Sequence, residues 1–195
     1  MRIGVAFGSA AISLVSLLPL ALATPARAAV APAGFVVENA APGVGFNLPV
    51  KVAFLPDGRW LVAEKRGRVY VVRNGTRLQT PLVNLESEII TNGDRGLLSM
   101  AVDPDYAHNR FVYLLYVVDP DSDAVDDNFE SFGRLVRYQT SATSPNIVDP
   151  ASRTILIGTT WSDGIPSGST SHSMGDLRWG ADGSLLISLG DGALY

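Results

Sequence analysis

The chain has 195 residues, of which 47% are hydrophobic, and it carries a formal net charge of −4. This length and hydrophobic content suffice for one ordinary domain with a core of its own. The absence of cysteine excludes disulfides, thiolate metal sites and a cysteine nucleophile, and without a dense Lys/Arg run we expect no nucleic-acid partner.

The first 28 residues have the three parts of an export signal. Arg2 is followed by an apolar run over 3–23, and Ala26-Arg27-Ala28 forms an A-x-A cleavage site. The alternative is a membrane-anchor helix, but the Gly, Ser and Pro residues of the run and the cleavage site favour the signal. We therefore predict a signal peptide over 1–28, a mature chain that starts near Ala29 without a membrane span, and a secreted or periplasmic location.

Residues 29–45 form a leader segment rich in Gly, Pro and Ala, and a series of short strands follows. The first strands are predicted over 50–55, 60–64 and 68–73, where Val, Tyr and Trp are enriched between turns that contain glycine. Further apolar strand segments occupy the ranges 96–117, 133–140, 153–159 and 174–192. Almost no sustained 3.6-residue period follows residue 30, so the domain is predicted to be all-β.

Three segments share one plan, in which an apolar strand, a turn with an aspartate and a second apolar strand follow one another. The turn residues are Asp57, Asp105 and Asp182, spaced 48 and 77 residues apart, and we expect each to have a local role in its turn. Repeats of roughly 40–50 residues with several strands favour a β-propeller over a β-sandwich. About three blades fit the mature chain, so residues 46–195 are predicted to be the N-terminal part of a longer propeller.

Propeller ligands bind at the mouth of the central channel, which the loops entering each blade surround. One such loop carries His172 and another carries Asp94 and Arg95, so these residues are predicted to share one site with His172 as a general acid or base. Asp191 follows the last strand and is placed to bond one imidazole nitrogen. The alternatives are a solvated histidine, a turn aspartate between two glycines and a surface role for Arg95.

Two other polar features are predicted to have no chemical role. His108 lies in a strand-to-strand turn and is expected to be exposed. The acidic run over 119–130 lacks the glycine and glutamate spacing of an EF-hand and is predicted to be a solvated insertion.

The ordered set of segments resembles the soluble quinoprotein glucose/sorbosone dehydrogenase family, also called aldose sugar dehydrogenases. The segments that carry the resemblance are "LPVKVAFLPDGRWLVAEKRGRVYVV", "GDRGLLSMAVDPDYAHNRFVYLLYV", "GRLVRYQT" and "SHSMGDLRWGADGSLLISLGDG". The resemblance implies a six-bladed propeller that binds pyrroloquinoline quinone and Ca²⁺ at the channel mouth. It also implies oxidation of the C1 hydroxyl of an aldose or related sugar to the lactone, with electrons passing to an external acceptor.

By this resemblance His172 is the general base, Asp191 orients and polarises it, and Asp94 stands where the family has Gln or Glu beside the cofactor. Asp94 is shorter than its family counterparts, and Ser171 stands where some members have an acidic residue. The resemblance assigns no metal ligand to this chain. The calcium ligands and the cations that hold the quinone are expected beyond residue 195, so we expect the chain alone to be inactive.

Three functions compete at this stage. The first is an exported quinoprotein sugar dehydrogenase, the second a non-catalytic propeller that serves as a binding module, and the third a metal-dependent lactonase-type propeller. The lactonase ranks last because it needs several carboxylate and Asn ligands in the channel, whereas the loops offer mainly His172 and Asp94.

Overall fold

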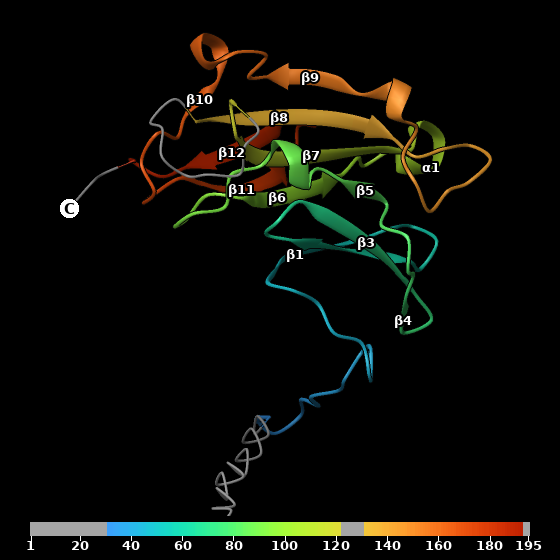
Figure 1. Ribbon diagram of the computed structural model, residues 1–195. Helices are drawn as coiled ribbons and strands as arrows, with labels where there is room; N and C mark the ends of the chain where they lie inside the picture. Colours follow the sequence, from blue (N-terminus) through green and yellow to red (C-terminus); the bar gives the residue numbers. More distant parts are fainter. Residues whose placement is uncertain (1–30, 122–130, 193–195) are drawn as a thin grey trace, which may run out of the picture. The chain divides into compact units, whose positions relative to one another are not determined.

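A computed structural model describes residues 31–121 and 131–192 (Figure 1). The chain divides into two units, Met1–Glu38 and Asn39–Tyr195, and the predicted signal peptide over 1–28 lies outside the described residues. In the first unit, the N–H of Phe35 donates to the carbonyl of Pro32 (3.1 Å) and closes a turn. Within the described part of the chain, no helix has the length and hydropathy needed to cross a bilayer.

The first sheet of the second unit is antiparallel and follows the predicted strands closely. Its strands are β1 (Pro49–Phe54), β2 (Trp60–Glu64), β3 (Arg68–Arg73) and β4 (Thr76–Arg77) in that order, with β5 (Val83–Asn84) also paired to β3. The turn from β3 to β4 is made by Asn74 and Gly75, both with positive φ (51° and 70°), as a two-residue type I′ hairpin turn requires. The 3₁₀ helix η1 (Glu86–Glu88) follows the sheet.

Two more antiparallel sheets follow in chain order. The second sheet has the order β10-β8-β7-β6, with β9 on β8, and the third pairs β11 with β12. The elements are β6 (Leu97–Val102), α1 (Tyr106–Asn109), β7 (Phe111–Val118), β8 (Phe132–Gln139), η2 (Pro150–Ser152), β9 (Thr154–Ile157), η3 (Trp161–Asp163), β10 (Ile165–Pro166), β11 (Met174–Trp179) and β12 (Leu185–Leu189). The prediction of an all-β domain is therefore confirmed.

The three turn aspartates have the local roles predicted for them. The carboxylate of Asp57 accepts hydrogen bonds from Arg59 (2.6 and 2.9 Å), and that of Asp182 accepts from the N–H of Ser184 (3.0 Å). Asp105 bonds His108 across the single turn of α1 (2.5 Å). Each contact closes a turn between two strands and needs no ligand.

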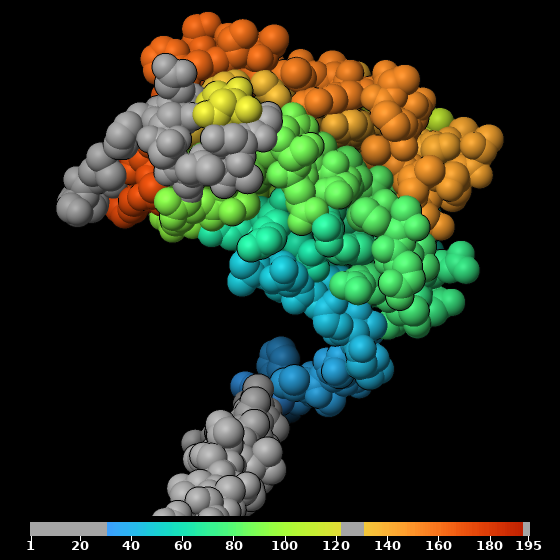
Figure 2. All heavy atoms as spheres, viewed as in Figure 1, coloured from blue at the N-terminus to red at the C-terminus, as the bar shows by residue number. Residues whose placement is uncertain are grey.

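The second sheet is buried on both faces, which explains the continuous apolar run of β7. Leu114 and Tyr116 pack with the first sheet, whereas Leu115 and Val117 pack with the third. Successive side chains of a strand point to opposite faces, so a strand between two layers needs apolar residues at every position. Figure 2 shows the segments of the first and second sheets directly against one another.

Polar side chains join the leading strands β1, β6 and β11 of the three sheets. The Asp176 carboxylate of β11 accepts a hydrogen bond from the Ser99 hydroxyl of β6 (2.7 Å) and forms an ion pair with Lys51 of β1. The Ser99 hydroxyl oxygen also accepts from the N–H of Leu177 (3.0 Å). This three-strand seam, formed by Lys51, Ser99 and Asp176, fixes β11 beside β6, and the loops that precede these two strands meet at one end.

Candidate functional site

The predicted base, His172, lies in the loop before β11 with its side chain 43% exposed. Its backbone is left-handed, with φ 52°, a conformation that few non-glycine residues adopt but in which His is enriched. Its N–H donates to Oδ2 of Asp94 (2.9 Å). The residue is thus held from the backbone, and the imidazole projects from a fixed turn.

The predicted hydrogen bond between Asp191 and the imidazole is present. Oδ1 of Asp191 lies 2.7 Å from Nδ1 of His172. The antiparallel pairing of β11 with β12 continues past both strands, because Gly190 N–H donates to the Ser173 carbonyl (2.6 Å) and Gly192 N–H donates to the His172 carbonyl (3.0 Å). A Cβ on Gly190 would collide with the His172 carbonyl oxygen, so glycine is required there.

The loop that carries Asp94 reaches His172 from the second sheet. The N–H of Asp94 donates to the Thr170 carbonyl (2.7 Å), and Gly93, with φ 58°, lies so close to that carbonyl that a Cβ would collide with its oxygen. The predicted meeting of Asp94 and His172 is therefore confirmed.

The prediction for Arg95 is wrong. Arg95 is 1% exposed, and its guanidinium donates to the Ser131 hydroxyl (2.8 Å) in the interior. Asp94 and Arg95 both lie in the turn that precedes β6. The exposed Asp94 bonds to the loop of His172, whereas the side chain of Arg95 is held in the interior by its bond to Ser131.

A buried serine network continues from Arg95 to the neighbour of His172, and sequence reasoning did not find it. Ser131 donates to the Ser167 carbonyl (2.9 Å), and the hydroxyls of Ser167 and Ser173 lie 2.5 Å apart. The serine-rich stretch before His172 was the only available signal. These buried hydrogen bonds connect the His172 loop to the protein interior.

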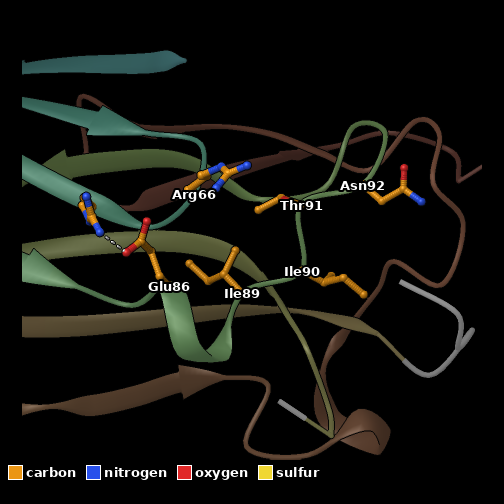
Figure 3. A pocket seen from close by; sticks show the side chains of 7 residues that line it. Arg66, Glu86, Ile89, Ile90, Thr91 and Asn92 are labelled. Carbon is orange, nitrogen blue, oxygen red and sulfur yellow. Dashed lines mark ion pairs between the residues drawn. The ribbon is translucent and has the colours of Figure 1, made fainter. Parts of the chain in front are cut away.

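Two pockets lie near these loops. One of about 320 Å³ is lined by Asp191, Gly192 and the serines of the His172 loop. The other, of about 610 Å³, is shown in Figure 3. It extends from Arg66 on the β2–β3 turn to Thr91 and Asn92 in the segment before β6. The ion pair drawn there joins Arg68 to Glu86 (2.6 Å).

The other sequence candidates lie elsewhere or are only partly described. His108, with 82% of its side chain exposed, lies beyond the far end of β6, which confirms the prediction of exposure. Its hydrogen bond to Asp105 raises the pKa of its imidazole. Of the acidic run over 119–130, residues 122–130 lie outside the described residues, and Asp119 is buried. Among residues 31–121 and 131–192, no group of three metal-ligating side chains occurs.

A family model gives the observation that decides the family. The model named Glucose / Sorbosone dehydrogenase matches residues 46–194, a range that contains all three sheets and the His172 site. The chain belongs to the Glucose / Sorbosone dehydrogenase family.

The curated relatives align with a large part of this chain but with only a small part of their own length. Mouse (Mus musculus) Hedgehog-interacting protein is 29% identical over 157 residues, which is 77% of this chain and 21% of the relative. An uncharacterized protein of Synechocystis sp. is 28% identical over 76% of this chain and 34% of its own length. The chain thus spans about a fifth to a third of these relatives.

Solved structures agree with the family. A putative oxidoreductase (glucose dehydrogenase) from Thermus thermophilus has 26% identity and a TM-score of 0.55 over 75% of this chain and 38% of that chain. The PQQ-bound aldose sugar dehydrogenase from Streptomyces coelicolor has 24% identity and a TM-score of 0.60, over 82% of this chain and 42% of its own. These likenesses confirm the β-propeller fold.

Proposed function

We propose that this member of the family is an exported quinoprotein dehydrogenase that oxidises the C1 hydroxyl of an aldose or related sugar to the lactone. The observation that carries the proposal is the 2.7 Å contact between His172 and Asp191, in a loop that two other chain segments hold in place. A histidine oriented by a carboxylate is the arrangement that general-base catalysis uses. The sugar dehydrogenases of similar fold support this choice.

The proton transfer follows from this arrangement. The Asp191 carboxylate accepts the hydrogen of Nδ1, so Nε2 is the basic nitrogen of the neutral ring. Nε2 takes the proton of the sugar C1 hydroxyl, and the negative charge of Asp191 stabilises the imidazolium that results. Pyrroloquinoline quinone would supply the hydride acceptor for C1 and the route by which electrons reach an external acceptor.

The described residues fit the proton-transfer side of this reaction better than the binding of an anionic quinone. His172 is bonded to two carboxylates, at Oδ2 of Asp94 and Oδ1 of Asp191. The positively charged guanidinium of Arg95 points into the interior instead. We propose that Asp94 lies beside the cofactor through its other oxygen, Oδ1. We also propose that cations and Ca²⁺ ligands beyond residue 195 hold the quinone, and that residues 1–195 alone bind neither tightly.

The first test is His172→Ala in the natural-length protein. Loss of a general base lowers a rate by about 10²–10⁴-fold, so dye-linked sugar oxidation in the presence of quinone and Ca²⁺ should fall by at least about 100-fold. His108→Ala is the matched control, because it removes the exposed histidine at the far end of the sheet, and it should keep the parent rate. A His172→Ala rate near that of the parent would show that His172 is not the base.

A second candidate function is a binding module without catalysis. The match to Hedgehog-interacting protein favours it, because that name describes binding. Such a module oxidises no sugar with or without quinone, so the parent protein in the same dye-linked assay separates the two functions.

Export is a separate part of the proposal. The predicted signal over 1–28 directs the protein to the periplasm or the medium. The sugar and the external electron acceptor would reach the protein there. N-terminal sequencing of the protein recovered from its host should start near Ala29. A first residue at Met1 would contradict export through this signal.

A further inference from the structure

Lys65 connects the first sheet to the loop that holds His172. It follows β2 directly, and its ammonium donates to the Gly93 carbonyl (2.5 Å). Its own carbonyl accepts from the N–H of Leu97 (2.8 Å). A Cβ on Gly96 would lie 2.8 Å from the Lys65 carbonyl oxygen, so backbone and side chain of Lys65 both press against the loop over 93–97.

The same loop continues to His172 through short contacts. Gly93 leaves no room for a side chain against Thr170, and the next residue, Asp94, bonds both the Thr170 carbonyl and the N–H of His172. A displacement at Gly93 therefore changes the position of the carboxylate under His172. The ammonium of Lys65 and the amide of His172 lie at the two ends of one continuous path across three sheets.

We infer that Lys65 is a positioning residue for the candidate base: by holding the Gly93 carbonyl, it keeps the Asp94 carboxylate under the His172 amide and the imidazole in its left-handed turn. The structural role of Lys65 holds whether or not the protein is an enzyme, whereas its effect on catalysis rests on the proposed function. A hydrogen bond from a charged donor is among the stronger ones in proteins, whereas the backbone conformation of His172 is one that needs outside support.

The adjacent Arg66 provides a matched control. It carries the same charge on the same turn, but its side chain lines the pocket of Figure 3. Among the described residues it has no hydrogen bond to the Asn92–Arg95 loop. Replacing either residue by methionine removes one positive charge from this turn. Only the replacement of Lys65 also removes the hydrogen bond to the Gly93 carbonyl.

The first measurement uses ¹⁵N-histidine labelling and does not depend on enzyme activity. The His172 amide signal, assigned by its loss in His172→Asn, reports the hydrogen bond to Asp94, and the His108 amide is an internal reference. In Lys65→Met we expect the His172 amide to move upfield and to exchange with solvent at least about 10-fold faster. In Lys65→Arg, whose side chain can still donate, the His172 amide should keep the parent's position and exchange rate. In Arg66→Met both should also be unchanged.

An unchanged His172 amide in Lys65→Met, or an equal change in Arg66→Met, would overturn the inference. If Lys65→Met also loses the His108 signal through misfolding, Lys65→Ala replaces it, since alanine cannot donate to the Gly93 carbonyl and fits any space that lysine leaves. The second measurement is dye-linked sugar oxidation, in which Lys65→Met should lower kcat at least about 10-fold with KM unchanged, while Lys65→Arg recovers it. If the parent oxidises no sugar, the proposed function fails, and the amide result still decides the role of Lys65.

Discussion

At the scale of the residue, the His172 site depends on backbone conformations as much as on side chains. A non-glycine residue in a sparsely populated conformation costs of order 1–3 kcal/mol, and His172 meets this cost with bonds to Asp94 and Asp191. Gly93 and Gly190 allow the close approach that these bonds need. The candidate base is thus held in one orientation before any ligand arrives.

The hydrogen bond to Asp191 predicts a loss of rate without a loss of fold. Asp191→Asn keeps an oxygen that can accept from Nδ1 but removes the charge that stabilises the imidazolium, so kcat should fall by about 10²-fold or more. Steady-state kinetics in the dye-linked assay measure this, and thermal unfolding should give a Tm close to the parent's because Asp191 is exposed. Asp182→Asn, in an exposed turn away from the imidazole, is the control. Equal rates for Asp191→Asn and the parent would rule out this role.

The sequence was sufficient to predict that His172, Asp191 and Asp94 meet, but not how they are held. His172 and Asp191 are bounded by recognisable turn residues, so their strands and their proximity follow from pattern. The bond from the His172 amide to Asp94 and the contact of Lys65 with Gly93 depend on three sheets packing together. Burial of Arg95 was missed because an arginine in a polar loop is usually solvated.

At the scale of the element, strands with clear turns were predicted to within a residue or two, and short elements were not. The bounds of β2 and β3 match the prediction. The two-residue strands β4, β5 and β10 carry too few residues for any period. They exist only because a longer neighbouring strand offers them hydrogen-bond partners, which is information that lies elsewhere in the chain.

The three-strand seam predicts a cost for loss of the Ser99 hydroxyl. Ser99 is fully buried, and Ser99→Ala leaves the N–H of Leu177 without its acceptor, which costs about 1–3 kcal/mol. Urea denaturation should show this decrease in the free energy of unfolding. Ser184→Ala, which removes an exposed turn hydroxyl, should change it by less than about 0.5 kcal/mol. Equal effects of the two substitutions would contradict the importance of the seam.

The same seam predicts a dependence of stability on acid. Burial alone raises the pKa of Asp176, but hydrogen bonds from Lys51, Ser99 and Arg178 outweigh it and hold that pKa well below the ordinary range. A carboxyl whose pKa is lower in the folded state stabilises the fold above the unfolded pKa of about 3.9, and this contribution is lost as the pH falls further. Stability of the parent should therefore decline more steeply from about pH 5 to pH 2.5 than that of Asp176→Asn. Parallel curves would contradict this.

At the scale of the whole molecule, the second sheet belongs to two hydrophobic cores. One core joins it to the first sheet and the other to the third. The T-shaped contact of Tyr113 with Trp179, at 5.3 Å between ring centroids, adds to the second core. A sheet shared in this way couples the unfolding of its neighbours, because neither core can open without exposing a face of β7.

Neighbouring leucines of β7 test this coupling. Leu114 and Leu115 are both fully buried but face the first and third sheets respectively. Each Leu→Ala substitution should cost about 2–5 kcal/mol, and each should leave a single unfolding transition when followed by circular dichroism and by tryptophan fluorescence. Two separate transitions in either variant would show that the cores unfold independently.

The close approach of Gly93 to Thr170 and of Gly190 to His172 has a consequence for protein engineering. A library that randomises these loops to obtain a new specificity has to leave both glycines unchanged, because a single methyl group at either one would collide with a carbonyl oxygen. Diversity belongs at Asn92 and Thr170, whose side chains are exposed beside the histidine loop. Variants at these two positions would change the surface beside the candidate base and leave the side chains that bond to His172 intact.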